Sequence, residues 1–184
     1  MGISAEVLAL REDIVSWRRS IHMHPELGFT EQRTSKLVCD ALRSFGFDEV
    51  LTDFCKAHTA VVGILRTGRP GHVVGLRADM DALPMQDEKD VPYRSQVPGV
   101  CHACGHDGHT AALLGAAKYC AAHRDQLCGT IKFVFQPAEE GPAPGGAKYI
   151  VESGVLDDVE FMIGGHQSTY ASVGQVSVSY THLR

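Results

Sequence analysis

The segment from Cys101 to His109, CHACGHDGH, holds more side chains able to bind a metal ion than packing alone requires. Thiolate and imidazole groups are typical zinc ligands. The two glycines of the segment allow the backbone to fold so that these side chains converge. We therefore interpret it as a metal site that uses Cys104 and His106, with support from Asp107 or His109.

Three alternatives for this segment are weaker. A polar loop that only caps the following helix would leave most of these ligands without a use. A zinc ribbon needs a second Cys-x2-Cys pair, but Cys120 and Cys128 lie too far apart to supply one. A thioredoxin-like redox pair of Cys101 and Cys104 would not explain the histidines that follow.

A pair of adjacent carboxylates, Glu139 and Glu140, follows an apolar segment and a proline. Such neighbours repel each other unless a cation neutralises one of them. The pair is either a solvated loop feature or part of the metal site. In the second case one glutamate binds the metal and the other acts as a general base on water. We expect an extended backbone here to point the two side chains in opposite directions.

Other candidate residues also follow apolar segments. His166 comes after two glycines, where a lone histidine could equally be structural. Asp79 and Asp81 flank one residue of an extended chain, so both project from the same side and one could orient a ligand. His22 and His24 remain open between packing and function. We expect the remaining histidines to lie at the surface: His58, His72, His123 and His182.

Helical periodicity and capping residues predict four helices. The first starts at Ser4 and stops before Pro25, and Thr30 caps a second helix that ends at Gly46. The inward residues that we expect are Val7, Leu10, Ile14, Trp17 and Ile21 in the first helix, and Leu37, Ala41 and Phe45 in the second. The other two helices cover residues 110–123 and 146–153, the last closed by Gly154.

Aliphatic runs predict strands at residues 60–65, 73–76, 131–135 and 161–163. The Gly-Arg-Pro-Gly turn at 68–71 predicts an antiparallel hairpin between the first two. Helices alternate with strands, which favours a three-layer α/β/α sandwich with a mixed sheet. The polar clusters follow strands, and ligands of open α/β sheets bind at the carboxyl ends of strands. We expect the clusters to meet there.

Composition limits the class of protein. The 184 residues carry a formal charge of −5 and are 44% hydrophobic, which is typical of a globular chain and gives no electrostatic footprint for nucleic acid or anionic lipid. We expect no membrane partner, because no apolar run approaches the roughly 20 residues of a membrane span. With no recognisable signal peptide, the six cysteines are expected to be reduced and the protein to be cytoplasmic.

Taken together, the motifs resemble the metal-dependent amidohydrolases that act on N-acyl amino acids. This family includes hippurate hydrolases and indole-acetyl-amino-acid hydrolases, and it is related to aminoacylases and carboxypeptidase G-type enzymes. The resemblance runs from about residue 5 to about residue 175. It rests on five segments: HMHPELGFTE (22–31), LRADMDALP (76–84), CHACGHDGHTAALLGAA (101–117), FQPAEEGPAPGGAKYIVESGVLDDV (135–159) and GGHQ (164–167).

The resemblance implies a co-catalytic site with two divalent metal ions, zinc or manganese, and a small N-acyl amino acid as substrate. It implies that Glu139 is the general base and that Asp81 orients the site behind the metals. The implied metal ligands are Cys104, His106, Glu140 and His166. Cys101 stands where a methionine is usual in the family.

Members of this family are roughly twice as long as this chain. The resemblance therefore implies that residues 1–175 are the N-terminal part of the catalytic domain, without the lid and dimerisation domain and the C-terminal part. Residues 176–184 do not follow the family pattern, and His182 is not expected to replace the missing ligand. The full-length form is expected to be a homodimer or larger. The alternative function is a metal-binding fragment or module without catalysis.

Overall fold

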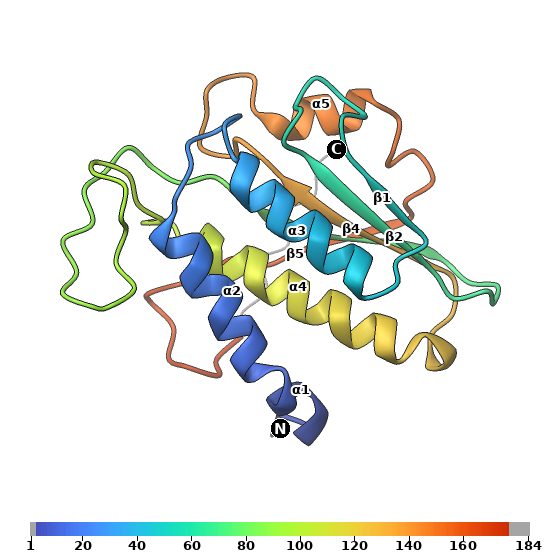
Figure 1. Cartoon of the computed structure of the whole chain (residues 1–184). Helices are drawn as coiled ribbons and strands as arrows, with labels where there is room; N and C mark the ends of the chain where they lie inside the picture. The colour runs from blue at the N-terminus through green and yellow to red at the C-terminus, as the bar shows by residue number, and fades with distance from the viewer. Residues whose placement is uncertain (1–2, 177–184) are drawn as a thin grey trace.

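A mixed sheet of five strands forms the centre of the computed structural model, which describes residues 3–176 (Figure 1). Its strands are β1 (Glu49–Leu51), β2 (Val61–Arg66), β3 (Val73–Asp79), β4 (Thr130–Gln136) and β5 (Phe161–Gly164), in the order β1-β2-β4-β3-β5. The pairs β1·β2 and β2·β4 are antiparallel, whereas β3 is parallel to both β4 and β5. Residues 177–184 lie outside the described part, and with them His182 and most of the tail that departs from the family pattern.

Helices cover both faces of this sheet. On one face lie α1 (Ala5–Ala9), α2 (Arg11–Met23), α3 (Gln32–Ser44) and α4 (His106–Ala122), and on the other lies α5 (Gly146–Glu152) (Figure 1). A short 3₁₀ helix, η1 (Arg124–Gln126), follows α4. The predicted three-layer α/β/α sandwich is confirmed. None of the described helices is long and apolar enough to span a membrane.

Two hydrophobic cores separate the layers, because successive strand residues point to opposite faces. Phe133 and Phe135 of β4 pack with Leu42 of α3 and Leu114 of α4 in the larger core. Val134, between the two phenylalanines, packs in the smaller core under α5. The central strand β4 is therefore buried on both faces, as its apolar sequence predicts.

The predicted hairpin between β2 and β3 is wrong, because β4 lies between these strands and pairs with both. The turn at 67–72 instead packs over Gly129, the residue before the central strand. The N–H of Gly129 donates to the carbonyl of Arg69, and its carbonyl accepts from the N–H of Thr67. The sequence predicts the turn correctly, but it does not show that β4 lies between the two strands that the turn connects.

Two of the predicted helices also differ from expectation. Ser4 does cap the first helix, accepting from the Val7 N–H, but the helix divides at Leu10 into α1 and α2. Thr30 does not cap α3. The carboxylate of Glu26 accepts from the N–H groups of Arg33 and Thr34, at 2.9 Å each, and fills this role from outside the helix.

The inward face of α3 is also rotated from the expected one. Val38 and Leu42 are fully buried, while Leu37, Ala41 and Phe45 are only partly buried at the edge of the larger core.

Candidate metal centre

The carboxyl ends of the parallel strands β3, β4 and β5 bring the predicted clusters together, as expected. Asp79 is the last residue of β3, the Glu139–Glu140 turn follows β4, and His166 follows β5. The amino end of α4 faces the same edge and supplies His106. Chain segments that are distant in the sequence thus converge on one site, which we call the His106 site.

Helix α4 begins at His106, four residues earlier than predicted. Gly105 before it has a left-handed backbone (φ 88°), which turns the chain into the helix. A side chain on Gly108 would collide with Gln167, because its Cβ would lie 2.3 Å from that amide nitrogen. His106, Asp107 and His109 are therefore fixed on a helix rather than held in a loop.

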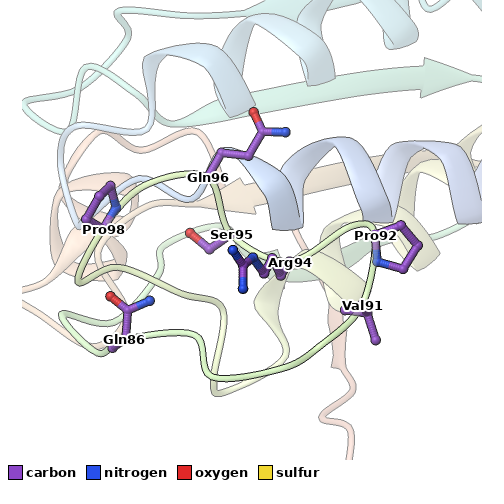
Figure 2. Close-up of a pocket in the computed structure, with 7 residues that line it drawn as sticks. All are labelled: Gln86, Val91, Pro92, Arg94, Ser95, Gln96 and Pro98. Atoms are coloured by element: carbon purple, nitrogen blue, oxygen red, sulfur yellow. The ribbon is translucent and has the colours of Figure 1, made fainter.

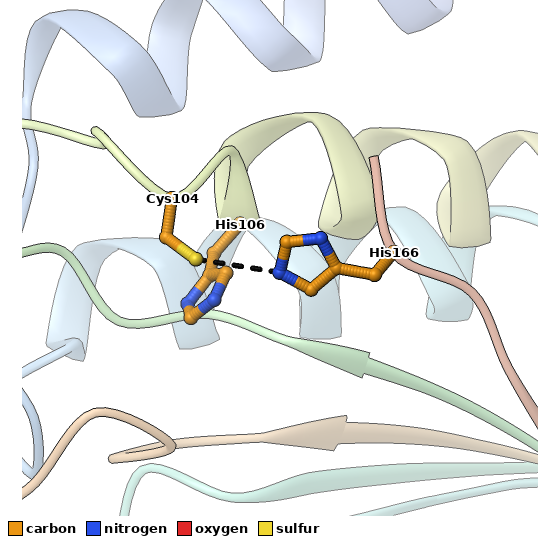
Figure 3. A group of neighbouring side chains, drawn as sticks. All are labelled: Cys104, His106 and His166. Carbon is orange, nitrogen blue, oxygen red and sulfur yellow. Dashed lines mark hydrogen bonds between the residues drawn. The ribbon is translucent and has the colours of Figure 1, made fainter. Parts of the chain in front are cut away.

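Cys104, His106 and His166 form the first group of possible ligands (Figure 3). Their ligand atoms all lie within 4.8 Å of one another. The Sγ of Cys104 is 3.3 Å from Nε2 of His166. The Nδ1–H of His166 donates to the carbonyl of Gln167, so its Nε2 is the nitrogen left to act as acceptor or ligand.

His106 is the centre of the site, and its side chain is almost completely buried. Its Nδ1–H donates to the carbonyl and Oδ1 of Asp81, at 3.0 and 3.1 Å. Its Nε2 has no hydrogen-bond partner among the described residues. This nitrogen lies 3.9 Å from Oε2 of Glu139 and 4.0 Å from Oε1 of Glu140. The Asp81 contacts thus fix the orientation of the ring, and its Nε2 faces three carboxylates, of which Oδ1 of Asp79 is the nearest at 3.7 Å.

The two adjacent glutamates do not point in opposite directions, so that expectation is wrong. Both carboxylates approach the same nitrogen of His106. The chain after β4 is bent rather than extended, with Ala138 at a left-handed φ of 49°. The N–H of Glu140 donates to Oδ2 of Asp81 at 2.9 Å, which holds the turn against the site.

A second histidine, His109, supports the segment that carries His166. Its Nδ1–H donates to Oδ1 of Asp79 at 2.6 Å, and its Nε2 accepts from the N–H of Gln167 at 2.9 Å. Asp79 in turn accepts from Arg77 at 2.7 Å. Asp79, His106 and His109 also form a possible ligand group. Sequence reasoning missed Arg77, although it lies within the segment 76–84 that carries part of the family resemblance.

The charges of the site shift its pKa values in opposite directions. Burial alone would raise the pKa of Asp79, but the hydrogen bond from His109 and the charges of His106 and Arg77 outweigh it and lower this pKa to about 2. Burial together with a hydrogen bond to Glu140 raises the pKa of the Cys104 thiol to about 11. Without a cation, the site is therefore a negative pocket that keeps its thiol protonated.

His22 belongs to a neighbouring buried network rather than to the His106 site. Its Nδ1–H donates to Asp107 at 2.7 Å, and Arg18 pairs with the same carboxylate oxygen at 2.7 Å. Asp87 lies 3.3 Å from its Nε2. This network ties α2 to the start of α4. His24 only donates to the carbonyl of Ser20.

The structure describes Cys101 and three of the four histidines that we expect at the surface. Cys101 is buried, pairs through its backbone with Leu83 and is absent from the ligand groups. His58 and His72 are exposed, and His123 is partly exposed. All six cysteines are free.

A cavity of about 480 Å³ lies in the loop between β3 and α4 (Figure 2). Its lining residues are Gln86, Val91, Pro92, Arg94, Ser95, Gln96 and Pro98. None of them belongs to the His106 site, and none is an acid, a cysteine or a histidine. The cavity therefore lacks metal ligands.

The sequence profile described as "Peptidase family M20/M25/M40" matches residues 75–181, which include every residue of the His106 site. The chain belongs to this peptidase family. The resemblance to metal-dependent amidohydrolases is thereby confirmed, since relatives within the family carry amidohydrolase names.

Two curated relatives show how much is shared. The N-acyl-L-amino acid amidohydrolase of Geobacillus stearothermophilus is 46% identical over 93% of this chain and 45% of its own length. The hippurate hydrolase of Campylobacter jejuni is 45% identical over 94% of this chain and 44% of its own length. The chain thus spans less than half the length of these relatives.

A solved structure of the same family has the same fold. The dinuclear metal-binding peptidase from Bacillus subtilis superposes with a TM-score of 0.81 at 40% identity, over 88% of this chain and 44% of that protein. Over this aligned part, the sheet and helices described above therefore have the arrangement found in a solved structure of the M20/M25/M40 family.

Proposed function

We propose that this chain is part of a metal-dependent hydrolase that cleaves the amide bond of N-acyl amino acids. The observation that carries the proposal is the buried, unpartnered Nε2 of His106, which faces two carboxylates beside a thiol and a second imidazole. A buried nitrogen without a partner is costly, and a cation would remove that cost. The amidohydrolase names of relatives support the substrate class.

The donor set fits divalent metal ions. We propose Cys104, His106, Glu140 and His166 as ligands, because Cys104 and His166 form one possible ligand group with His106, and Glu140 belongs to another group that shares His106. The dinuclear site named for the Bacillus subtilis relative supports two ions. Thiolate and imidazole favour zinc, whereas the carboxylates also suit manganese. A divalent cation in such a site supplies Lewis acidity, which lowers the pKa of water and polarises a carbonyl.

Glu139 is the proposed general base. It lies at the site but is more exposed than Glu140, so its carboxylate can reach an attacking water. It accepts the proton of that water as the new carbon–oxygen bond forms. It then returns the proton to the amide nitrogen as the carbon–nitrogen bond breaks. Asp81 keeps His106 in the tautomer whose Nε2 lone pair faces the site.

The direct test is the release of free amino acid from N-acetyl and N-benzoyl amino acids by the zinc- or manganese-loaded protein. We expect release that stops on addition of a chelator and returns when metal is restored. A zinc-loaded chain that binds metal but releases no amino acid would contradict the proposed hydrolysis. That result would favour the alternative of a metal-binding module without catalysis.

A further inference from the structure

A buried carboxylate contacts the backbone of the Glu139–Glu140 turn. Glu31 precedes α3, and its side chain is completely buried. Its Oε1 accepts from the N–H of Ala138 at 2.9 Å, and its Oε2 accepts from the hydroxyl of Thr59 at 2.7 Å. Both carboxylate oxygens are therefore used, one of them on the backbone of the residue just before Glu139.

The backbone at this point needs support. Ala138 has a left-handed φ of 49°, a conformation that residues with a Cβ rarely adopt. Two buried carboxylates hold the turn from two sides, since Glu31 accepts from Ala138 while Asp81 accepts from Glu140. The path of the turn, and hence the direction of both glutamate side chains, is fixed by these bonds.

The segment that carries Glu31 also touches the rest of the site. The carbonyl of Glu26 accepts from the N–H of Ala82 at 2.8 Å, next to Asp81. Gly28 packs directly on the glutamate turn, because a Cβ there would lie 1.9 Å from the carbonyl oxygen of Gly141. Residues 26–31 thus contact both chain segments whose carboxylates meet at His106.

We infer that Glu31 is a positioning residue that sets the geometry of the Glu139–Glu140 turn, and through it the metal affinity of the His106 site. The inference rests on the proposed function, in which Glu140 binds metal. Glu31 acts only through the backbone of Ala138. What matters is the hydrogen-bond acceptor that it presents there, and its negative charge is not required.

The test is a Co²⁺ titration of the whole chain, followed by the thiolate-to-cobalt absorption that Cys104 would produce. Glu31→Ala removes the acceptor, and we expect Co²⁺ affinity to fall by roughly 10–100-fold, as for other residues that support metal ligands. Glu31→Gln keeps an oxygen for the Ala138 N–H, so we expect affinity within a few-fold of wild type. Thermal melting of the metal-free proteins shows that each variant is folded.

Glu26→Ala is the matched control. The carboxylate of Glu26 caps α3 through Arg33 and Thr34 and does not touch the glutamate turn. We expect this variant to melt at a lower temperature and to bind Co²⁺ as wild type does. If Glu31 only stabilised the fold, as Glu26 does, Glu31→Ala would lower the melting temperature without changing Co²⁺ affinity.

Four outcomes would overturn the inference. The first is wild-type affinity in a folded Glu31→Ala variant, and the second is Glu31→Gln binding as weakly as Glu31→Ala. If Glu31→Ala does not fold, Thr59→Val is used instead, because it removes the hydroxyl that orients the Glu31 carboxylate. The third outcome is a Thr59→Val variant with unchanged Co²⁺ affinity. The fourth is a wild-type chain without Co²⁺ binding, which would contradict the proposed function as well. The first three leave the proposed function standing.

Discussion

At the scale of single residues, the two adjacent glutamates are assigned different tasks although both face His106. Beyond burial, both glutamates raise the pKa of the Cys104 thiol, and Glu140 is the larger cause of the two. Glu139 has the more exposed side chain, at 42% against 31% for Glu140. The assignment therefore rests on neighbours and exposure, since the alternation of an extended chain does not apply to this bent turn.

Replacing each glutamate by glutamine tests this assignment. Glu139→Gln should keep the bound metal while the rate of amide hydrolysis falls by roughly 10²–10⁴, the usual contribution of a general base. Glu140→Gln should lose metal first, and excess metal should partly restore the rate. Metal content and amino acid release are measured on the same samples. If Glu139→Gln loses metal while Glu140→Gln keeps it, Glu139 is the ligand and Glu140 the base, which contradicts the assignment.

His102 gives a prediction for stability against pH. Burial lowers its pKa to about 4, from an ordinary value of 6.5. The unfolded chain therefore takes up a proton below pH 6.5 that the folded chain takes up only near pH 4. The free energy of unfolding of the metal-free protein should fall by about 3 kcal/mol across this window as pH decreases.

Denaturant unfolding at several pH values checks the His102 prediction. His102→Asn should reduce the loss of stability between pH 6.5 and 4, whereas the exposed His58→Asn should leave it unchanged. The raised pKa of His106 acts above pH 6.5 and so falls outside the window. Equal pH dependence in wild type and His102→Asn would contradict the assignment.

At the scale of elements, most strands and helices follow from periodicity and capping residues in the sequence. The pairing of β2 with β4 rather than β3 does not, because local turn residues cannot show which distant strand will enter between two neighbours. The start of α4 was misplaced because Gly105, Gly108 and polar residues fill its first turn, where tertiary contacts override weak helix propensity.

The candidate site was predictable in part. Cys104, His106, Glu140 and His166 stand out by residue type, and the structure brings them together. Their supports were harder to see. Glu31 and Arg77 lie within motif segments 22–31 and 76–84, but only the three-dimensional contacts show that Glu31 holds Ala138 and that Arg77 holds Asp79.

Gly28 tests the packing of residues 26–31 against the glutamate turn. Gly28→Ala places a Cβ against the carbonyl of Gly141, so the backbone must shift, and we expect lower stability and weaker metal binding. Gly46→Ala is the comparison, because Gly46 has open space and only a left-handed φ of 78°. It should cost about 1 kcal/mol and leave metal affinity unchanged. Calorimetric zinc titration and denaturant unfolding separate the two effects, and equal zinc affinity in both would refute the packing argument.

At the scale of the whole molecule, the edge of the sheet formed by β5 is apolar and exposed. Phe161, Met162 and Ile163 are 56%, 47% and 59% exposed, and among the described residues this strand pairs only with β3. A hollow beside it is lined by Leu113 and Ile163 together with His109 and His166 of the His106 site. Exposed edges and apolar patches of this kind promote association between chains.

We therefore expect the chain to be oligomeric or poorly soluble when purified by itself. Ile163→Lys should shift it towards monomer in sedimentation velocity, because a charge on an edge strand opposes pairing. Val151→Lys, at an equally exposed apolar position on α5, should have little effect. A monodisperse wild-type monomer would show that this expectation is wrong.

The central claim, that the His106 site is a metal centre, is tested most directly by zinc content at limiting zinc in two cysteine variants. Cys104 lies within reach of His106 and His166, whereas Cys101, three residues earlier, is buried outside the ligand groups. The account predicts that Cys104→Ala loses zinc and that Cys101→Ala retains it. Retention by Cys104→Ala together with loss by Cys101→Ala would contradict it.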